Sequence, residues 1–146
     1  MIYKTQLKDL IERTLKEYNL YSYEAFQLVY GTIIQESKRG TYIRQNVDNF
    51  NINIHAVGIG QTEKGTFDWL KSSYEATIPD LANIKFEELE YNLKYSILFC
   101  RLRYRKDKQP IPKTLDEQAK LWKRVYNTIH GKGTVEEYLQ NYKQYS

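Results

Sequence analysis

Apolar residues recur at helical spacing along most of this 146-residue chain, and that periodicity constrains its fold more than any other feature. The pattern covers an N-terminal segment, about Lys4 to Tyr18, and a second segment that Ser22 can cap. We expect the second helix to stop near Gly40, a residue suited to a left-handed helix end. The longest apolar stripe runs from about Phe86 to Arg105. The sequence therefore predicts a mainly helical fold.

Three shorter helices complete the predicted set. One follows Thr66, and two open at TLDE and TVEE, where Thr114 and Thr134 precede a glutamate by three positions, as in a capping box. Between the second predicted helix and the one that follows Thr66, residues 41–61 are rich in asparagine and have no helical period. We expect a loop with a short irregular or β-hairpin element there. Without repeats, low-complexity segments or linkers, residues 1–146 are expected to form one compact domain.

Composition limits the kinds of site that the chain can build. Cys100 is the only cysteine, so an internal disulfide is excluded, and its apolar neighbours predict that it packs as a small hydrophobe. With two histidines in addition, we expect neither a metal cluster nor a cofactor. The net charge of +4 favours acidic partners such as nucleic acid or an anionic cell wall.

The distribution of charges also bears on location. The first residues carry lysines and an aspartate where a signal peptide would have an apolar stretch, and no run reaches the roughly twenty apolar residues of a membrane-spanning helix. We therefore expect synthesis in a cytoplasm without a signal peptide, and no insertion into a membrane. A role outside the cell would then require delivery by another component.

A glutamate stands at the apolar edge of the second predicted helix. In LVYGTIIQESKRG, at about 100° per residue, Glu36 projects beside Val29 and Ile33 rather than on the opposite face. Taken alone, it would be read as a solvated residue in a last helical turn, since glutamate is almost never fully buried. Two further motifs change that interpretation.

The three motifs follow one another in a fixed order. QES at 35–37 ends a helix, AVGIGQ at 56–61 follows the polar loop, and VYNTIHGKG at 125–133 closes a late helix. In this order they resemble the lysozyme-like lytic transglycosylases, the group of soluble lytic transglycosylase and goose-type lysozyme, and particularly its small phage-type members. That family has a Glu-Ser at a helix end, then a Gly-Leu-Met-Gln-like stretch, then an Ala-Tyr-Asn-Ala-Gly-like stretch. The resemblance spans about residues 28–142.

The resemblance implies a lysozyme-like α+β domain with an active-site cleft. It implies that Glu36 is the catalytic acid, and that the substrate-binding residues are Ser37, Gln61, Tyr126 and Asn127. The substrate would be peptidoglycan, cleaved at the β-1,4 bond between N-acetylmuramic acid and N-acetylglucosamine. The sequence departs from the family pattern in Ile59-Gly60 and Thr128-Ile129, which concern the sugar subsites more than the catalytic step.

The chemistry agrees with the position of Glu36. Cleavage of a glycosidic bond needs a proton on the departing oxygen, so the acid must hold its proton near neutral pH. Apolar neighbours disfavour the ionised carboxyl and raise its pKa, as they do for a lysozyme glutamate. We expect Val29, Ile33 and Tyr126 to provide these surroundings.

A second carboxylate would decide the outcome of the reaction. An inverting hydrolase needs a base that activates water, and the candidates are Glu63, two positions after Gln61, and Asp48 in the asparagine-rich loop. A transglycosylase needs no such base, because the substrate's own acetamido group or 6-hydroxyl completes the reaction. Goose-type lysozymes carry an acid at the position that Glu63 matches, yet Glu63 can equally favour a following helix through its dipole. The transglycosylase is the preferred prediction.

Two other functions are compatible with the sequence. RLRYRKDK at 101–108 is a basic run with an interleaved tyrosine, which would suit a non-enzymatic nucleic-acid-binding domain. A virion structural protein that keeps the fold without turnover is the other alternative. For the preferred function we expect a monomer that binds peptidoglycan glycan strands, binds no specific nucleic acid, and reaches the bacterial cell wall by holin-type release or as a virion component.

The remaining aromatic and imidazole side chains are assigned to structure. Trp69 and Trp122 are expected in the core, although one of them would also suit stacking on a sugar. His55 and His130 are expected to be polar loop residues, because neither has a pattern of partners typical of a nucleophile.

Overall fold

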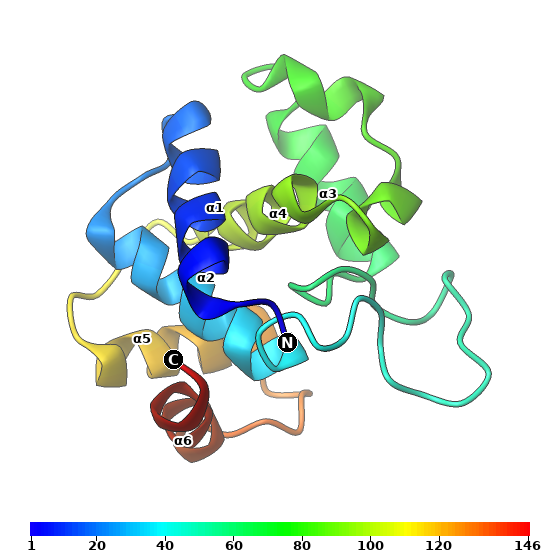
Figure 1. The fold of residues 1–146 in the computed structure, drawn as a ribbon. Coiled ribbons are helices and arrows are strands. Elements are labelled where there is room, and N and C mark those ends of the chain that lie inside the picture. Colours follow the sequence, from blue (N-terminus) through cyan, green and yellow to red (C-terminus); the bar gives the residue numbers. More distant parts are fainter.

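A computed structural model describes all residues from 1 to 146 and is mainly helical, as the periodicity predicts. Six α-helices are joined by two 3₁₀-helical turns and one π-helical turn (Figure 1). In chain order the elements are α1 (Lys4–Glu17), α2 (Tyr23–Ser37), α3 (Lys64–Tyr74), η1 (Pro79–Asn83), η2 (Phe86–Glu90), α4 (Leu93–Arg105), α5 (Leu115–Leu121), η3 (Trp122–Asn127) and α6 (Val135–Tyr145).

Side-chain caps fix the start of several helices. The hydroxyl of Ser22 accepts a hydrogen bond from the backbone N–H of Ala25 at 3.0 Å and opens α2 as predicted. Thr114 and Thr134 accept from the N–H groups three positions later, at 3.3 and 3.1 Å, and open α5 and α6. Because these caps stand directly before apolar runs, the helix starts could be predicted from the sequence.

The predicted helix from Phe86 to Arg105 is wrong in its first third. A 3₁₀ turn, η2, covers Phe86–Glu90, and α4 begins only at Leu93. The cause is Asn92, whose side-chain oxygen accepts from the N–H of Tyr95 at 3.1 Å and caps a new helix. Tyr91 lies in the break and is 71% exposed.

A single cluster of 25 buried residues forms most of the core. It draws on both faces of α2 and α4, which explains why these two helices carry the longest apolar runs. α6 packs across α2 at Gly31, where an added Cβ would lie 2.2 Å from the hydroxyl oxygen of the fully buried Tyr138. Glycine at this position therefore permits the close crossing of the two helices.

Residues 41–61 form an irregular segment that extends away from the helices in Figure 1. Its only ladder contacts are isolated antiparallel bridges of Val57 with Arg44 and with Thr62. Just before it, α2 ends at Ser37, and Lys38, Arg39 and Gly40 all have positive φ angles, 50°, 55° and 77°. The predicted helix end at Gly40 is therefore three residues too late.

The two chain termini meet at the end of α2. The Arg39 guanidinium donates to the carbonyl oxygens of Ile2, at 2.8 Å, and of Tyr145. An added Cβ at Gly40 would lie 2.4 Å from Cδ1 of Ile2. None of the helices combines the length and the apolar character needed to cross a membrane.

Candidate active site

Glu36 lies in the last turn of α2, and its side chain is partly buried. The indole Nε1–H of Trp122 donates to Oε2 of Glu36 at 3.0 Å. Trp122 is itself fully buried and packs on Tyr138, with 5.3 Å between the ring centroids. The glutamate is therefore held by a rigid aromatic side chain from the far end of the sequence.

The surroundings of Glu36 change its acidity. Burial raises its pKa from 4.5 to about 7, while the hydrogen bond from Trp122 acts in the opposite direction, because it stabilises the carboxylate. A carboxyl group with a pKa near 7 exists in both protonation states at neutral pH. Such a group can donate a proton in one step and accept one in the next.

Ser37 is buried and takes part in the turn that follows α2. Its hydroxyl donates to the carbonyl oxygen of Ile33 and accepts from the N–H of Gly40, each at 3.0 Å. These bonds satisfy backbone groups at the helix end, which accounts for the early stop of α2. Sequence reasoning assigned this side chain to the substrate, and in the structure its hydroxyl is turned into the fold.

The tyrosine-asparagine motif stands on η3, a π-helical turn. The N–H of Thr128 donates to the carbonyl oxygen of Lys123 at 2.7 Å, a bond that spans five residues instead of four. Single π-helical turns are rare in proteins, and those that occur are often at functional sites. Here the turn carries both Trp122, the partner of Glu36, and Tyr126.

Tyr126 connects η3 to the end of the irregular segment. Its hydroxyl donates to the carbonyl oxygen of Gly60, and its ring stacks on Tyr104 with 5.3 Å between centroids. Next to Gly60, Gln61 has a φ of 52° and donates through Nε2 to the carbonyl oxygen of Gly58 at 3.0 Å. The tyrosine thus fixes where Gln61 stands.

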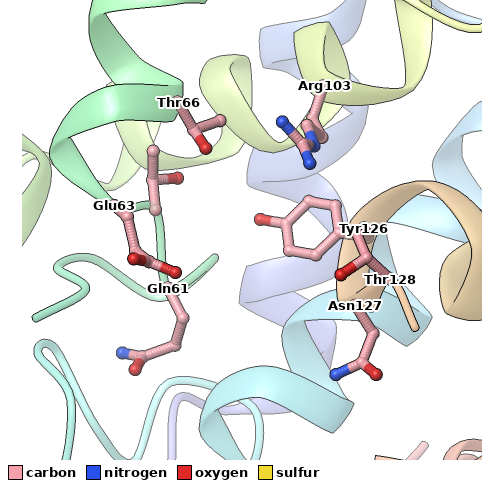
Figure 2. Close-up of a pocket in the computed structure, with 8 residues that line it drawn as sticks. Gln61, Glu63, Thr66, Arg103, Tyr126, Asn127 and Thr128 are labelled. Atoms are coloured by element: carbon pink, nitrogen blue, oxygen red, sulfur yellow. The ribbon is translucent and has the colours of Figure 1, made fainter. Parts of the chain in front are cut away.

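A polar pocket of about 150 Å³ lies between these segments. Figure 2 shows its walls, with Gln61 and Glu63 on one side, Tyr126, Asn127 and Thr128 on the other, and Thr66 and Arg103 above. The structure therefore brings three of the predicted site residues together: Gln61, Tyr126 and Asn127.

Glu36 is not among the residues that line this pocket, but it lies within electrostatic reach of it. Burial, then the charges of Cys100 and Glu36, raise the pKa of Tyr126 well above its ordinary value. In Figure 2 the last turns of α2 run below Asn127 in this view. Glu36 therefore lies close enough to Tyr126, which lines the pocket, for its charge to act on the tyrosine hydroxyl.

The two candidate second carboxylates lie in different places. Glu63 is exposed, lines the pocket, and precedes α3 without making a side-chain cap bond. Asp48 is also exposed, but it lines a separate hollow formed by residues 41–50. Glu63 alone of the two shares the pocket with Gln61 and Tyr126.

Asn127 is held from behind. The Lys123 ammonium donates to its side-chain oxygen at 2.6 Å and to the carbonyl oxygen of Gly131 at 3.0 Å. The amide nitrogen of Asn127 has no hydrogen-bond acceptor within the protein.

Sequence reasoning missed the contact between Trp122 and Glu36. It assigned Trp122 only to the core, where it does lie. Trp122 precedes Tyr126 by four positions, and this spacing could have indicated that both side chains lie on the same face of a helical segment. Trp69 was also expected in the core and is instead 45% exposed, because it lies on the outer face of the short helix α3. Arg103 and Thr66 were not anticipated in the pocket.

The histidines lie apart from this pocket. Nδ1 of His55 accepts from the backbone N–H of Asn51 at 2.9 Å, and His130 is exposed. No group of three or more His, Cys, Asp and Glu side chains is arranged to hold a metal ion. In comparisons with models of known protein families, with curated proteins and with solved structures, this chain has no match.

Proposed function

We propose that this chain is a lysozyme-like enzyme that cleaves the β-1,4 bond between N-acetylmuramic acid and N-acetylglucosamine in peptidoglycan. The observation that carries the proposal is Glu36, a partly buried carboxyl group with a pKa near 7 that is fixed by Trp122. The polar pocket that joins Gln61, Tyr126 and Asn127 supports it, since these residues come from the other two motifs of the family pattern.

Glu36 acts twice in the proposed reaction. Protonated, it transfers its proton to the glycosidic oxygen as the bond from that oxygen to the anomeric carbon breaks. The substrate's acetamido oxygen stabilises the developing positive charge at that carbon. The Glu36 carboxylate then takes the proton of the muramyl 6-hydroxyl, whose oxygen attacks the anomeric carbon and closes a 1,6-anhydro ring. Protons and bonds balance without a second protein carboxylate.

A hydrolase remains the alternative outcome, with water in place of the 6-hydroxyl. The position of Glu63 in the pocket favours it over Asp48 as the base that would activate this water. The exposure of Glu63 to solvent and its place before α3 agree equally with a purely structural role.

Substrate contacts follow from the free polar atoms of the pocket. The Asn127 amide nitrogen and the Gln61 side-chain oxygen are available to sugar hydroxyl and acetamido groups, because their other polar atoms are bonded within the protein. Ser37 would support the site indirectly, through the turn that follows Glu36.

The place of action is part of the proposal. A net charge of +4 favours association with an anionic cell wall, which suits a phage endolysin or a virion-associated lysin. Either protein would be made inside a host cell and would then act on the bacterial cell wall.

A zymogram on purified peptidoglycan tests the proposed function. Wild-type protein should clear the gel, Glu36→Gln should lose at least about a thousandfold in rate because it has no proton to donate, and Glu63→Gln should retain clearing. Circular dichroism should show the same helix content in all three proteins. Clearing by Glu36→Gln at the wild-type rate would contradict the proposal.

Analysis of the released fragments separates the two outcomes. Mass spectrometry should find anhydromuramyl ends, which are one water lighter than ordinary reducing ends. Ordinary reducing ends, together with loss of activity in Glu63→Gln, would establish the hydrolase instead.

A further inference from the structure

Two cations flank an exposed tryptophan beside the candidate active site. The guanidinium carbon of Arg103 lies 5.3 Å, and the ammonium nitrogen of Lys106 4.7 Å, from the centroid of the Trp69 ring. Both belong to the basic run at 101–108, which the proposed function leaves without a role. Trp69 is 45% exposed, so its ring is available to a ligand.

Neither cation has an acidic partner in the protein. Arg103 donates through Nε to the carbonyl oxygen of Val125 at 3.2 Å, and Lys106 donates to the hydroxyl of Ser73 at 3.0 Å. Asp107 lines the hollow that Trp69, Arg103 and Lys106 also line, but its carboxylate is bound by both terminal nitrogens of Arg124, at 3.0 and 3.3 Å. The two positive charges therefore have aromatic faces, those of Trp69 and Tyr74, but no carboxylate as a partner.

This hollow and the candidate active site share one lining side chain. Arg103 lines both the pocket of Gln61 and Tyr126 and a second pocket of about 170 Å³, which Trp69 and Lys106 also line. Its Nε bond to Val125 fixes the guanidinium between them and leaves the other N–H donors free. A ligand in the first pocket can thus reach the cations of the second.

We propose that Arg103 and Lys106 bind a carboxylate of the substrate, with Trp69 as a stacking surface for the adjoining sugar or peptide. This inference rests on the proposed function. Peptidoglycan carries carboxylates on its stem peptides, and on the lactyl group where a stem has been removed. The planar guanidinium presents paired donors that match a carboxylate. The subsite makes substrates with a free carboxylate preferred over neutral glycans.

Binding measured in the Glu36→Gln background, where no turnover occurs, tests the subsite. The ligands are glycan oligomers with stem peptides, the same oligomers after amidase removal of the stems, and chitin oligosaccharides, which lack carboxylates. Arg103→Gln with Lys106→Gln should weaken binding of carboxylate-bearing ligands about tenfold more than it weakens chitin binding, and Lys106→Gln alone, which lies outside the Gln61 pocket, should leave chitin binding unchanged. Weakening limited to stem-bearing oligomers assigns the stem peptide, weakening limited to the amidase-treated oligomers assigns the lactyl carboxylate, and weakening of both shows that the subsite accepts either carboxylate.

The control is Lys108→Gln with Lys113→Gln, which removes the same charge from exposed positions outside both pockets. Lys106→Gln alone guards against misfolding, since the side chain makes one hydrogen bond, to Ser73, and otherwise lies over the rings of Trp69 and Tyr74, and it should weaken binding about threefold. Unchanged affinity for carboxylate-bearing ligands in the double variant and in Lys106→Gln, or an equal loss on chitin oligosaccharides, would overturn the inference.

The same measurements distinguish this inference from the proposed function. Cleavage of peptidoglycan by wild-type protein with unaltered binding in the variants would remove only the carboxylate subsite. Carboxylate-dependent glycan binding by a protein that releases no fragments would remove only the cleavage.

Discussion

Glu36 and Glu63 lie at opposite ends of their helices and in opposite surroundings. Glu36 is partly buried in the last turn of α2, where the helix dipole disfavours a negative charge, and it is held by a buried indole. Glu63 is exposed just before α3, where the dipole favours a negative charge, and its side chain caps nothing. The same side chain therefore has different surroundings at the two positions. Those of Glu36 favour the protonated form, whereas those of Glu63 favour a negative charge.

The comparison extends to the elements that hold each side of the pocket. Trp122 and Tyr126 both belong to η3, yet Trp122 bonds to Glu36 whereas Tyr126 bonds to Gly60, next to Gln61. One short π-helical turn therefore positions both sides, and changing one residue at a time should separate them.

Glu36→Gln should have the largest effect on the pH dependence of stability. In the native protein Glu36 keeps its proton up to about pH 7, whereas in the unfolded chain it loses it near pH 4.5. Between these values the native state binds more protons, so the free energy of unfolding falls as pH rises, by at most about 3 kcal/mol. The glutamine variant lacks this decline. Urea unfolding at pH 4 and pH 8 measures it.

Glu63→Gln is the matched control, because it makes the same chemical change at an exposed carboxylate. It should keep the wild-type decline in stability with pH. If the free energy of unfolding changes equally between pH 4 and pH 8 in the wild type and in Glu36→Gln, burial does not hold the proton on Glu36.

Trp122→Phe should come next in size. It removes the indole donor and part of a fully buried side chain, at a cost of about 2 kcal/mol in the free energy of unfolding. Loss of this bond also raises the pKa of Glu36, because the bond stabilises the carboxylate. The decline in stability, and any pH limit on activity, should therefore extend to higher pH. Unfolding curves and rates between pH 6 and 9 measure both.

Trp69→Phe serves as the control for Trp122→Phe. Its indole is 45% exposed and makes no bond to Glu36, so stability should change by less than about 1 kcal/mol and the pH dependence not at all. An identical pH dependence in Trp122→Phe and the wild type would leave the indole with a packing role only.

The sequence predicted the helices better than it predicted this division of labour. Periodicity and caps such as Ser22 are local signals, and they placed the starts of α1, α2, α5 and α6 correctly. The third helix, expected after Thr66, begins at Lys64. The break at Asn92 was missed because its cap interrupts an apolar stripe that looks continuous. The bond between Glu36 and Trp122 joins residues 86 positions apart, and no periodic pattern specifies such a pairing.

The site could be anticipated where a motif marked it. Gln61, Tyr126 and Asn127 share a pocket in the structure, and their roles toward a substrate stay predictions. Arg103 belongs to the basic run at 101–108, which the sequence associated with nucleic acid rather than with this pocket, and Trp69 belongs to no motif. Their proximity results from the packing of α3 on α4, which the sequence does not state.

Tyr126→Phe should have the smallest effect and act on the other side of the pocket. It removes the hydroxyl that donates to the carbonyl oxygen of Gly60 while the ring keeps its stacking on Tyr104. The change removes one hydrogen bond to the backbone of the buried Gly60, so the cost should be about 1 kcal/mol. Hydrogen exchange should accelerate at the amides of Gln61 and Thr62, which bond to Gly58 and Val57. The pH dependence set by Glu36 should remain.

Tyr104→Phe, which removes a buried hydroxyl 2.7 Å from that of Thr32, should destabilise the protein without selective exchange at those amides. Equal acceleration in both variants would mean that Tyr126 supports the fold as a whole rather than the Gln61 side of the pocket.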